Sequence, residues 1–179
     1  MHDWNVIATV HSDSFREACR LLEEYGPVNR TGYYNVLVMK VEDRTAFMDA
    51  LAARIAEEPG LLNLVSQVMP AETTFDFASA EEFEAKSRMA SLGFVDRLAG
   101  KRFHVRMHRR GFEGALSSQV EERFLDNFLL AALVEADTPG EITFDKPDSI
   151  LAVETVGQRA GMSLWTRDDV QRYSFLRHD

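Results

Sequence analysis

Cysteine is nearly absent from this sequence, since Cys19 is the single one among 179 residues. One cysteine cannot form an intramolecular disulfide, so a packed core has to hold the fold together. No apolar run approaches the ~18 residues of a membrane-spanning helix. The first residues also lack a basic segment followed by an apolar one, which a secretory signal requires. These absences exclude a disulfide scaffold and predict a cytoplasmic protein that does not associate with membranes.

Positive charge is also scarce overall, with 20 Lys and Arg against 29 Asp and Glu and a net charge of −9. This balance argues against a protein that coats nucleic acid without specificity. The distribution is uneven, however. The segment 101–110 reads KRFHVRMHRR, with five Lys or Arg, two His and no acid. A local cationic site on an acidic protein is therefore compatible with the sequence.

Sequence motifs of common catalytic sites are missing as well. The sequence contains no GxxxxGK phosphate loop, no GxGxxG fingerprint after a strand and no GxSxG nucleophile elbow. His104 and His108 would share one face of a strand about 13 Å apart, too far to bind one metal ion. We therefore expect no metal, no cofactor and no catalytic activity.

Residues 1–70 alternate strand-like and helix-like patterns. The predicted strands are 4–10, 28–30, 33–41 and 61–69. The predicted helices are 14–25 and 44–57. The order β-α-β-β-α-β is the split pattern of a ferredoxin-like fold.

The remaining residues predict a second α+β region after a polar crossing at 71–78. Helices are expected over 79–98 and from 118 to about 135, the second beginning with a Ser118/Glu121 capping box. We expect the second helix to bury Val120, Phe124 and Phe128. The expected strands are 102–108, 141–144, 149–156 and 162–165.

The basic strand 102–108 has an informative alternation. Phe103, Val105 and Met107 should point one way, and the basic side chains between them the other way. Arg and Lys on one face can bind phosphate oxygens, and the start of the next helix near Ser117 adds N–H groups that favour anions. The alternative is a solvated strand face whose arginines pair with glutamates.

Four stretches of the second half resemble the THUMP domain, the RNA-binding module of tRNA-modifying proteins. They are the basic strand with its exit (101–111), the helix from Ser118 to about Glu135, the stretch EITFDKPD (141–148) and the closing strands (149–154 and 161–164). The sequence departs from the family pattern where Phe128-Leu129 replaces an Ile-Gly pair. THUMP domains commonly follow a small ferredoxin-like domain, which agrees with the pattern in residues 1–70.

The resemblance implies an α+β protein with a ferredoxin-like domain at 1–75 and a THUMP-like domain at 76–179. It implies a stand-alone adaptor that binds the acceptor stem and 3′ end of tRNA and presents them to a separate modifying enzyme, as in N4-acetylcytidine formation. We expect the RNA-binding residues to be Lys101, Arg102, His104, Arg106, His108, Arg109, Arg110, Lys146 and Arg159.

Three other classes stay open. The chain could be a protein-interaction module that uses its acidic first half, a THUMP domain that has lost RNA binding, or a small enzyme of unknown type. Salt-dependent tRNA binding separates the first two from the RNA-binding prediction.

Overall fold

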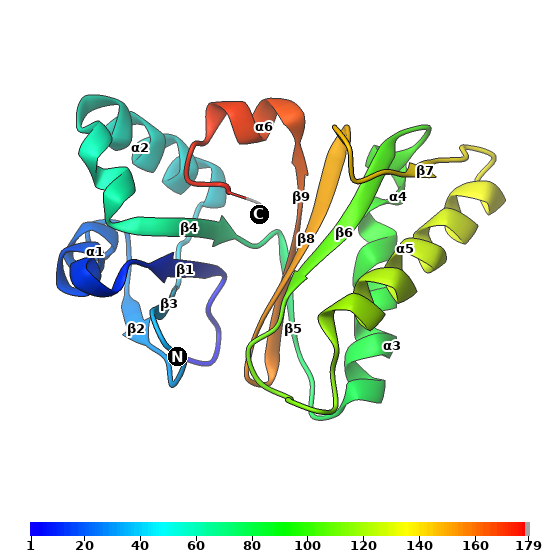
Figure 1. Ribbon diagram of the computed structural model, residues 1–179, viewed down its shortest axis with the longest axis horizontal. Helices are drawn as coiled ribbons and strands as arrows, with labels where there is room; N and C mark the ends of the chain where they lie inside the picture. The colour runs from blue at the N-terminus through cyan, green and yellow to red at the C-terminus, as the bar shows by residue number, and fades with distance from the viewer. Residues whose placement is uncertain (178–179) are drawn as a thin grey trace. The chain divides into compact units, whose positions relative to one another are not determined.

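The chain folds into two compact units in the computed structural model, which describes residues 1–177. The first unit comprises Met1–Glu72 and the segment from Asp168 onward, and the second comprises Thr73–Arg167. Both units combine helices with strands, which confirms the predicted α+β class. Figure 1 labels their elements.

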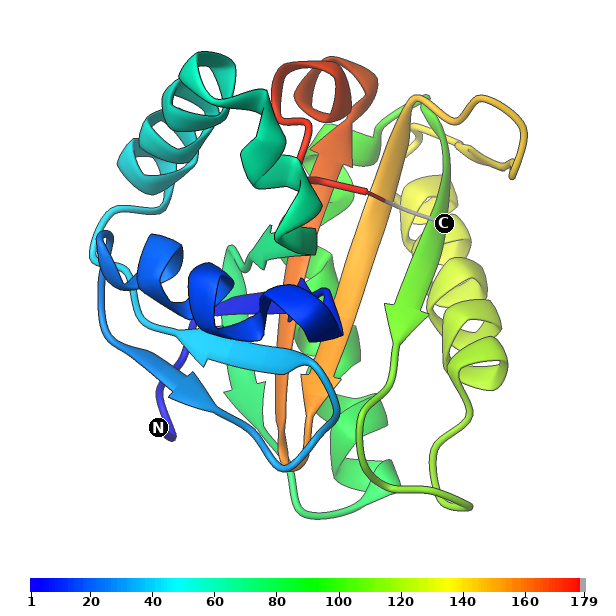
Figure 2. The same ribbon diagram turned by 60° about the vertical axis from the view of Figure 1, so that its left-hand side comes forward.

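The first unit has the predicted β-α-β-β-α-β order. Its elements are β1 (Val6–Val10), η1 (Ser12–Ser14), α1 (Phe15–Glu23), β2 (Val28–Arg30), β3 (Val36–Met39), α2 (Arg44–Glu57), η2 (Pro59–Asn63) and β4 (Val65–Pro70). The strands form one sheet in the order β2-β3-β1-β4, and all its pairs are antiparallel. Helices α1 and α2 cover one face of this sheet (Figure 2). Strand β3 lies between β1 and β2, and β1 lies between β3 and β4.

The last described residues complete this first unit. Helix α6 (Arg167–Arg172) leads to a segment in which Phe175 accepts a backbone hydrogen bond from Val68 of β4 at 3.0 Å. The hydroxyl of Tyr173 donates to Asp49 of α2 at 2.6 Å. The sequence analysis placed these residues in the second domain and did not predict α6. Their pairing with β4 and α2 is a long-range contact that no local pattern indicates.

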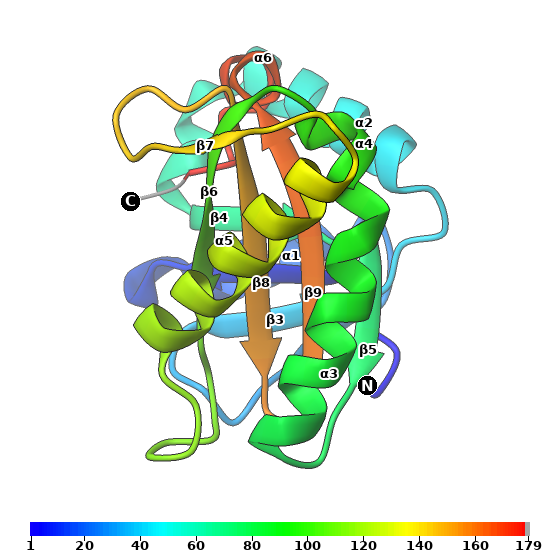
Figure 3. The same ribbon diagram turned by 90° about the vertical axis from the view of Figure 1, so that its right-hand side faces the viewer.

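The second unit contains five strands and the helices that cover them. Its elements are β5 (Thr73–Asp76), α3 (Ala80–Ser91), η3 (Leu92–Phe94), α4 (Val95–Leu98), β6 (Arg102–His108), α5 (Ser118–Glu135), β7 (Glu141–Ile142), β8 (Ser149–Val156) and β9 (Arg159–Thr166). The sheet order is β5-β9-β8-β6-β7, with β6 parallel to both of its neighbours. Helices α3 and α5 lie over one face of this sheet (Figure 3).

Strand β5 differs from the sequence expectation, which read 71–78 as a polar crossing. Thr73–Asp76 pairs antiparallel with β9 and forms an edge of the second sheet. Only one face of an antiparallel edge strand needs to be apolar, so two threonines and an aspartate are tolerated there. The boundary between the units consequently falls at 72/73, whereas the sequence suggested 75/76.

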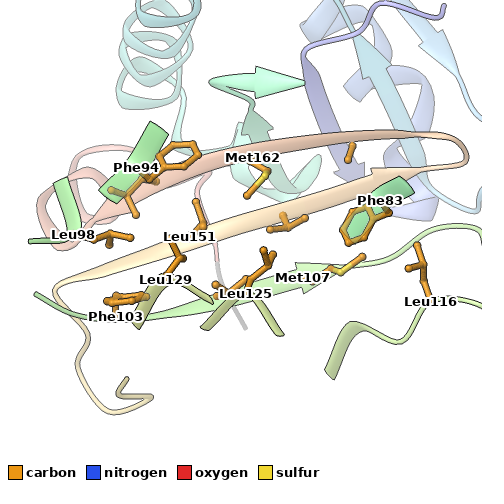
Figure 4. Close-up of a cluster of buried hydrophobic side chains, with 14 of the residues drawn as sticks. Phe83, Phe94, Leu98, Phe103, Met107, Leu116, Leu125, Leu129, Leu151 and Met162 are labelled. Atoms are coloured by element: carbon orange, nitrogen blue, oxygen red, sulfur yellow. The ribbon is translucent and has the colours of Figure 1, made fainter. Parts of the chain in front are cut away.

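The core of the second unit fills the space between its sheet and helices. Phe103 and Met107 of β6 meet Leu125 and Leu129 of α5 there (Figure 4). Of the three residues expected on the buried face of α5, Phe124 and Phe128 pack against this core, whereas Val120 is 58% exposed. The most deeply buried residues of the helix are Leu125, Leu129 and Leu133, so its buried face is only slightly rotated relative to the prediction.

Within the described residues 1–177, no helix has the length and apolar character that a membrane crossing requires.

Candidate nucleic-acid interface

Strand β6 has the alternation that its sequence predicts. Phe103, Val105 and Met107 are buried in the core of the second unit. Arg102 is exposed, and His104, Arg106 and His108 are half-buried. Because side chains alternate along a strand, these four point away from the helices α3 and α5. The core contacts on one face thus fix a row of basic groups on the other.

Two acidic residues of α5 accept hydrogen bonds from backbone N–H groups of β6 that have no partner strand. Strand β7 pairs only with Arg102 and Phe103, so the following N–H groups on that edge need other acceptors. The N–H of Val105 donates to Asp126 Oδ1 at 2.8 Å, and that of Met107 donates to Glu122 Oε1 at 2.7 Å. Burial raises the pKa of Asp126 to about 6, although the Val105 N–H acts against this rise. The sequence analysis did not identify these anchors, which hold the basic strand against α5.

Two of the predicted RNA-binding residues have a buried acidic partner on β8. Glu154 is fully buried and lies opposite His108 in the parallel register. Its Oε1 is 2.8 Å from His108 Nδ1, and its Oε2 accepts a hydrogen bond from Arg110 Nη1. The basic segment 101–110 contains no acid, but the fold brings Glu154 from β8 next to it. His108 and Arg110 therefore connect β6 to β8 and are poorly placed to contact phosphates.

Arg159 has a comparable structural role. Its Nη1 donates to Asp76 Oδ1 at 3.0 Å and its Nη2 to Thr74 Oγ1 at 2.7 Å. These bonds join β9 to the edge strand β5. The guanidinium side chain is only 14% exposed, so Arg159 is also better explained as a structural residue.

Lys101 and Arg102 lie at the start of the basic strand, and both are exposed. Arg102 Nη2 is 3.9 Å from Asp148 Oδ1, a long surface contact of little energetic weight. Lys146 is exposed too, and a positive φ of 48° places it in a tight turn between β7 and β8. Here the structure brings three of the predicted cations to one end of β6.

Arg109 lies at the opposite end of β6, where a pocket opens. The pocket has a volume of about 560 Å³ and includes Arg109, Ser117 and Ser118 in its lining. Ser117 is the N-cap of α5, but its side chain makes no capping hydrogen bond. The first-turn N–H groups of an 18-residue helix and one guanidinium therefore share a pocket, an arrangement that favours an anion.

The same pocket contains Glu121, and the predicted Ser118/Glu121 capping box is not formed. Helix α5 begins at Ser118, so Glu121 lies beyond the third helical position, from which a capping box reaches back. Its side chain is 3% exposed and faces Glu84 of α3. Burial, followed by the charge and hydrogen bond of Glu84, raises the pKa of Glu121 to about 7. This carboxyl changes charge near neutral pH, next to a candidate anion site.

Phe144 is an exposed aromatic residue that the sequence analysis did not select. It follows β7, is 74% exposed, and its ring centroid is 4.9 Å from that of His104. The turn sequence Asp145-Lys146-Pro147-Asp148 directly after it was the available indication that its side chain could lie outside the core.

Among residues 1–177, no group of three or more His, Cys, Asp or Glu side chains is arranged to hold a metal ion.

Comparison with known proteins found a relative in sequence and solved structures that share the fold. No family model matches the chain. A tRNA sulfurtransferase from Shewanella woodyi is 28% identical over 163 residues, which cover 88% of this chain and 32% of the relative. The chain therefore spans about a third of that protein.

Two solved structures share the fold over most of the chain. PH1313 from Pyrococcus horikoshii has a TM-score of 0.59 at 14% identity, covering 90% of this chain and 54% of that one. A 4-thiouridine synthetase, solved as an RNA complex with bound ATP, has a TM-score of 0.54 at 15% identity. It covers 91% of this chain and 41% of that one.

These comparisons contradict the expectation that the chain is a non-catalytic adaptor. The proteins it resembles include a sulfurtransferase and a synthetase, so the similarity points to tRNA-modifying enzymes. The sequence argument was wrong because it relied on missing catalytic motifs within 179 residues. Those residues match only part of each similar protein.

Proposed function

We propose that this chain binds tRNA and positions its acceptor stem and 3′ end for a tRNA-modifying active site. The observation that carries the proposal is the row of basic side chains on β6, which begins with exposed Arg102 and is flanked by exposed Lys101 before the strand and Arg109 after it. Both the THUMP resemblance and the names of the similar proteins support tRNA as the ligand. Contacts of this kind read the RNA backbone and shape and leave its sequence largely unread.

The structure reduces the set of phosphate contacts that we propose. His108, Arg110 and Arg159 are engaged by Glu154 and Asp76. From the cations predicted by the sequence we keep Lys101, Arg102, Arg106, Arg109 and Lys146 as proposed contacts. Arg109 also donates a hydrogen bond to the carbonyl oxygen of Gly111. The helix α5 N-terminus would add N–H donors next to Arg109.

A salt titration tests this proposal directly. Each neutralised phosphate contributes about −0.7 to −0.9 to the slope of log affinity against log salt, so five contacts predict a slope of about −4. Arg102→Ala should weaken tRNA binding and make the slope shallower by about 1. Arg123→Ala removes one exposed cation from α5 and serves as the matched control. No binding at low salt would refute the proposal and favour the acidic protein-interaction surface.

We further propose that the tRNA modification is a thiolation. The sulfurtransferase and synthetase names favour thiolation over the N4-acetylcytidine expected from the adaptor resemblance. Nucleoside analysis of tRNA from cells with and without this protein distinguishes them. Loss of 4-thiouridine would support thiolation, whereas loss of N4-acetylcytidine with normal 4-thiouridine would support acetylation by a separate partner enzyme.

A further inference from the structure

The segment after β7 presents an aromatic surface next to the basic strand. Phe144 is 74% exposed, and its ring packs at 39° against the ring of His104, with 4.9 Å between the centroids. The two rings come from the outward face of β6 and from the loop that follows β7. Figure 3 shows this loop along the edge of the second sheet.

Hydrogen bonds hold the His104 ring and the backbone on both sides of Phe144. His104 Nδ1 is 3.0 Å from the carbonyl oxygen of Thr143, the residue before Phe144. The N–H of Thr143 donates to the carbonyl of Phe103 at 2.9 Å, and its hydroxyl donates to Asp145 O at 3.1 Å. An aromatic ring fixed in this way loses little conformational freedom when a ligand stacks on it.

Cations lie on the chain segments connected to the same loop. The N–H of Asp148 donates to Arg102 O at 2.7 Å, and the N–H of Arg102 donates back to Asp148 Oδ2 at 2.9 Å. Arg167 Nη2 donates to the carbonyl of Lys146 at 2.7 Å. The positively charged side chains of Arg102, Lys146 and Arg167 therefore belong to the loop that carries the exposed Phe144 ring or to segments hydrogen-bonded to that loop. Asp145 and Asp148 lie in this loop as well, so the cationic character is moderate.

We propose that Phe144, supported by His104, is a stacking platform for one unpaired nucleobase of the bound RNA, whose flanking phosphates contact Arg102 and Lys146. This inference rests on the proposed tRNA-binding function and specifies the part of the RNA that the site takes. An aromatic face beside cations suits a nucleotide, because the base stacks and the phosphate is neutralised. Bases inside an A-form duplex are already stacked, so the site takes a nucleotide from a single-stranded end or loop.

The test compares two RNA hairpins that share one acceptor-stem sequence. One carries an unpaired 3′ extension with 2-aminopurine in place of a base, and the other is blunt. Phe144→Ala should weaken binding of the extended hairpin about five- to tenfold, as expected for loss of one stacked base. It should abolish the quenching of 2-aminopurine and leave binding of the blunt hairpin unchanged. Phe144→Trp should retain both affinity and quenching.

Met89→Ala provides the matched control, since Met89 is a 72% exposed apolar residue of α3 in the same unit. Circular dichroism checks that each variant is folded. Unchanged affinity of Phe144→Ala for the extended hairpin would overturn the inference, and so would an equal loss for both hairpins. If the parent protein, without substitutions, binds neither hairpin, the proposed tRNA-binding function has failed. This outcome is distinguishable from the two results that overturn only the stacking inference.

Discussion

Glu121 should make the stability of the second unit depend on pH in a direction opposite to that of most carboxylates. Its pKa rises from 4.5 to about 7, because the side chain is buried and faces Glu84. The stability that protonated Glu121 contributes is complete below pH 4.5 and is lost as the pH rises through about 7. At about 1.4 kcal/mol for each pKa unit, the ionised form costs the folded unit about 3 kcal/mol.

The perturbation is Glu121→Gln, which has nearly the same shape and stays neutral. Near pH 4 the variant and the parent should differ little, since Glu121 is then mostly protonated in both the folded and the unfolded chain. Near pH 8 the variant should be more stable by about 2–3 kcal/mol. With a denaturant dependence of about 1–3 kcal/mol/M in urea, this difference moves the unfolding midpoint by about 0.7–3 M.

The assay can observe the second unit selectively in the full chain. The sequence has two tryptophans, Trp4 in the first unit and Trp165 in β9 of the second. In a Trp4→Phe background, tryptophan fluorescence during urea unfolding reports on β9. Glu84→Gln should reduce the pH dependence by removing the neighbouring charge, and Glu113→Gln, at an exposed acid, should not. Equal pH profiles for the parent and Glu121→Gln would refute the reasoning.

Two further predictions concern the acids that hold the basic strand. Asp126→Ala removes the acceptor of the buried Val105 N–H and should destabilise the second unit by about 1–3 kcal/mol; Asp126→Asn keeps an acceptor and should cost less. Hydrogen exchange at the Val105 amide checks this, and equal exchange in both variants would contradict it. Glu154→Gln should lower stability by about 3 kcal/mol, because Arg110 and His108 lose a buried partner. The same variant should bind tRNA more tightly, and weaker binding at low salt would contradict this interpretation.

Local sequence patterns were sufficient to predict β6 and α2. Each of these elements can be recognised from the spacing of apolar residues and the breaking residues within its own segment. The apolar positions of β6 alternate strictly, so its two faces follow from the sequence alone. Helix α2 occupies the predicted 44–57. Its end is set by Pro59-Gly60, which cannot continue a helix.

The face of α5 could not be predicted in the same way. Apolar residues occur almost all around this helix, including Val120, Phe124, Leu125 and Leu129. A helix that is apolar on most sides has no single preferred face by periodicity. Its rotation is decided by the sheet and by polar anchors such as Asp126, which reaches the edge of β6. The ion pair between Glu154 and Arg110 is equally long-range, since the two residues are 44 positions apart in the sequence.

The acidic net charge of −9 is compatible with an RNA site because surface charges act over short distances. At physiological salt, exposed charges separated by more than about 8 Å are largely screened. The acids that matter for a bound phosphate are therefore the nearby ones. They are Glu141, Asp145 and Asp148 at one end of β6 and the Glu84–Glu121 pair at the other. Asp148 remains a carboxylate, since the Arg102 N–H lowers its pKa. Glu121 is neutral below about pH 7, so the pocket beside Arg109 becomes more favourable to a phosphate as the solution is acidified.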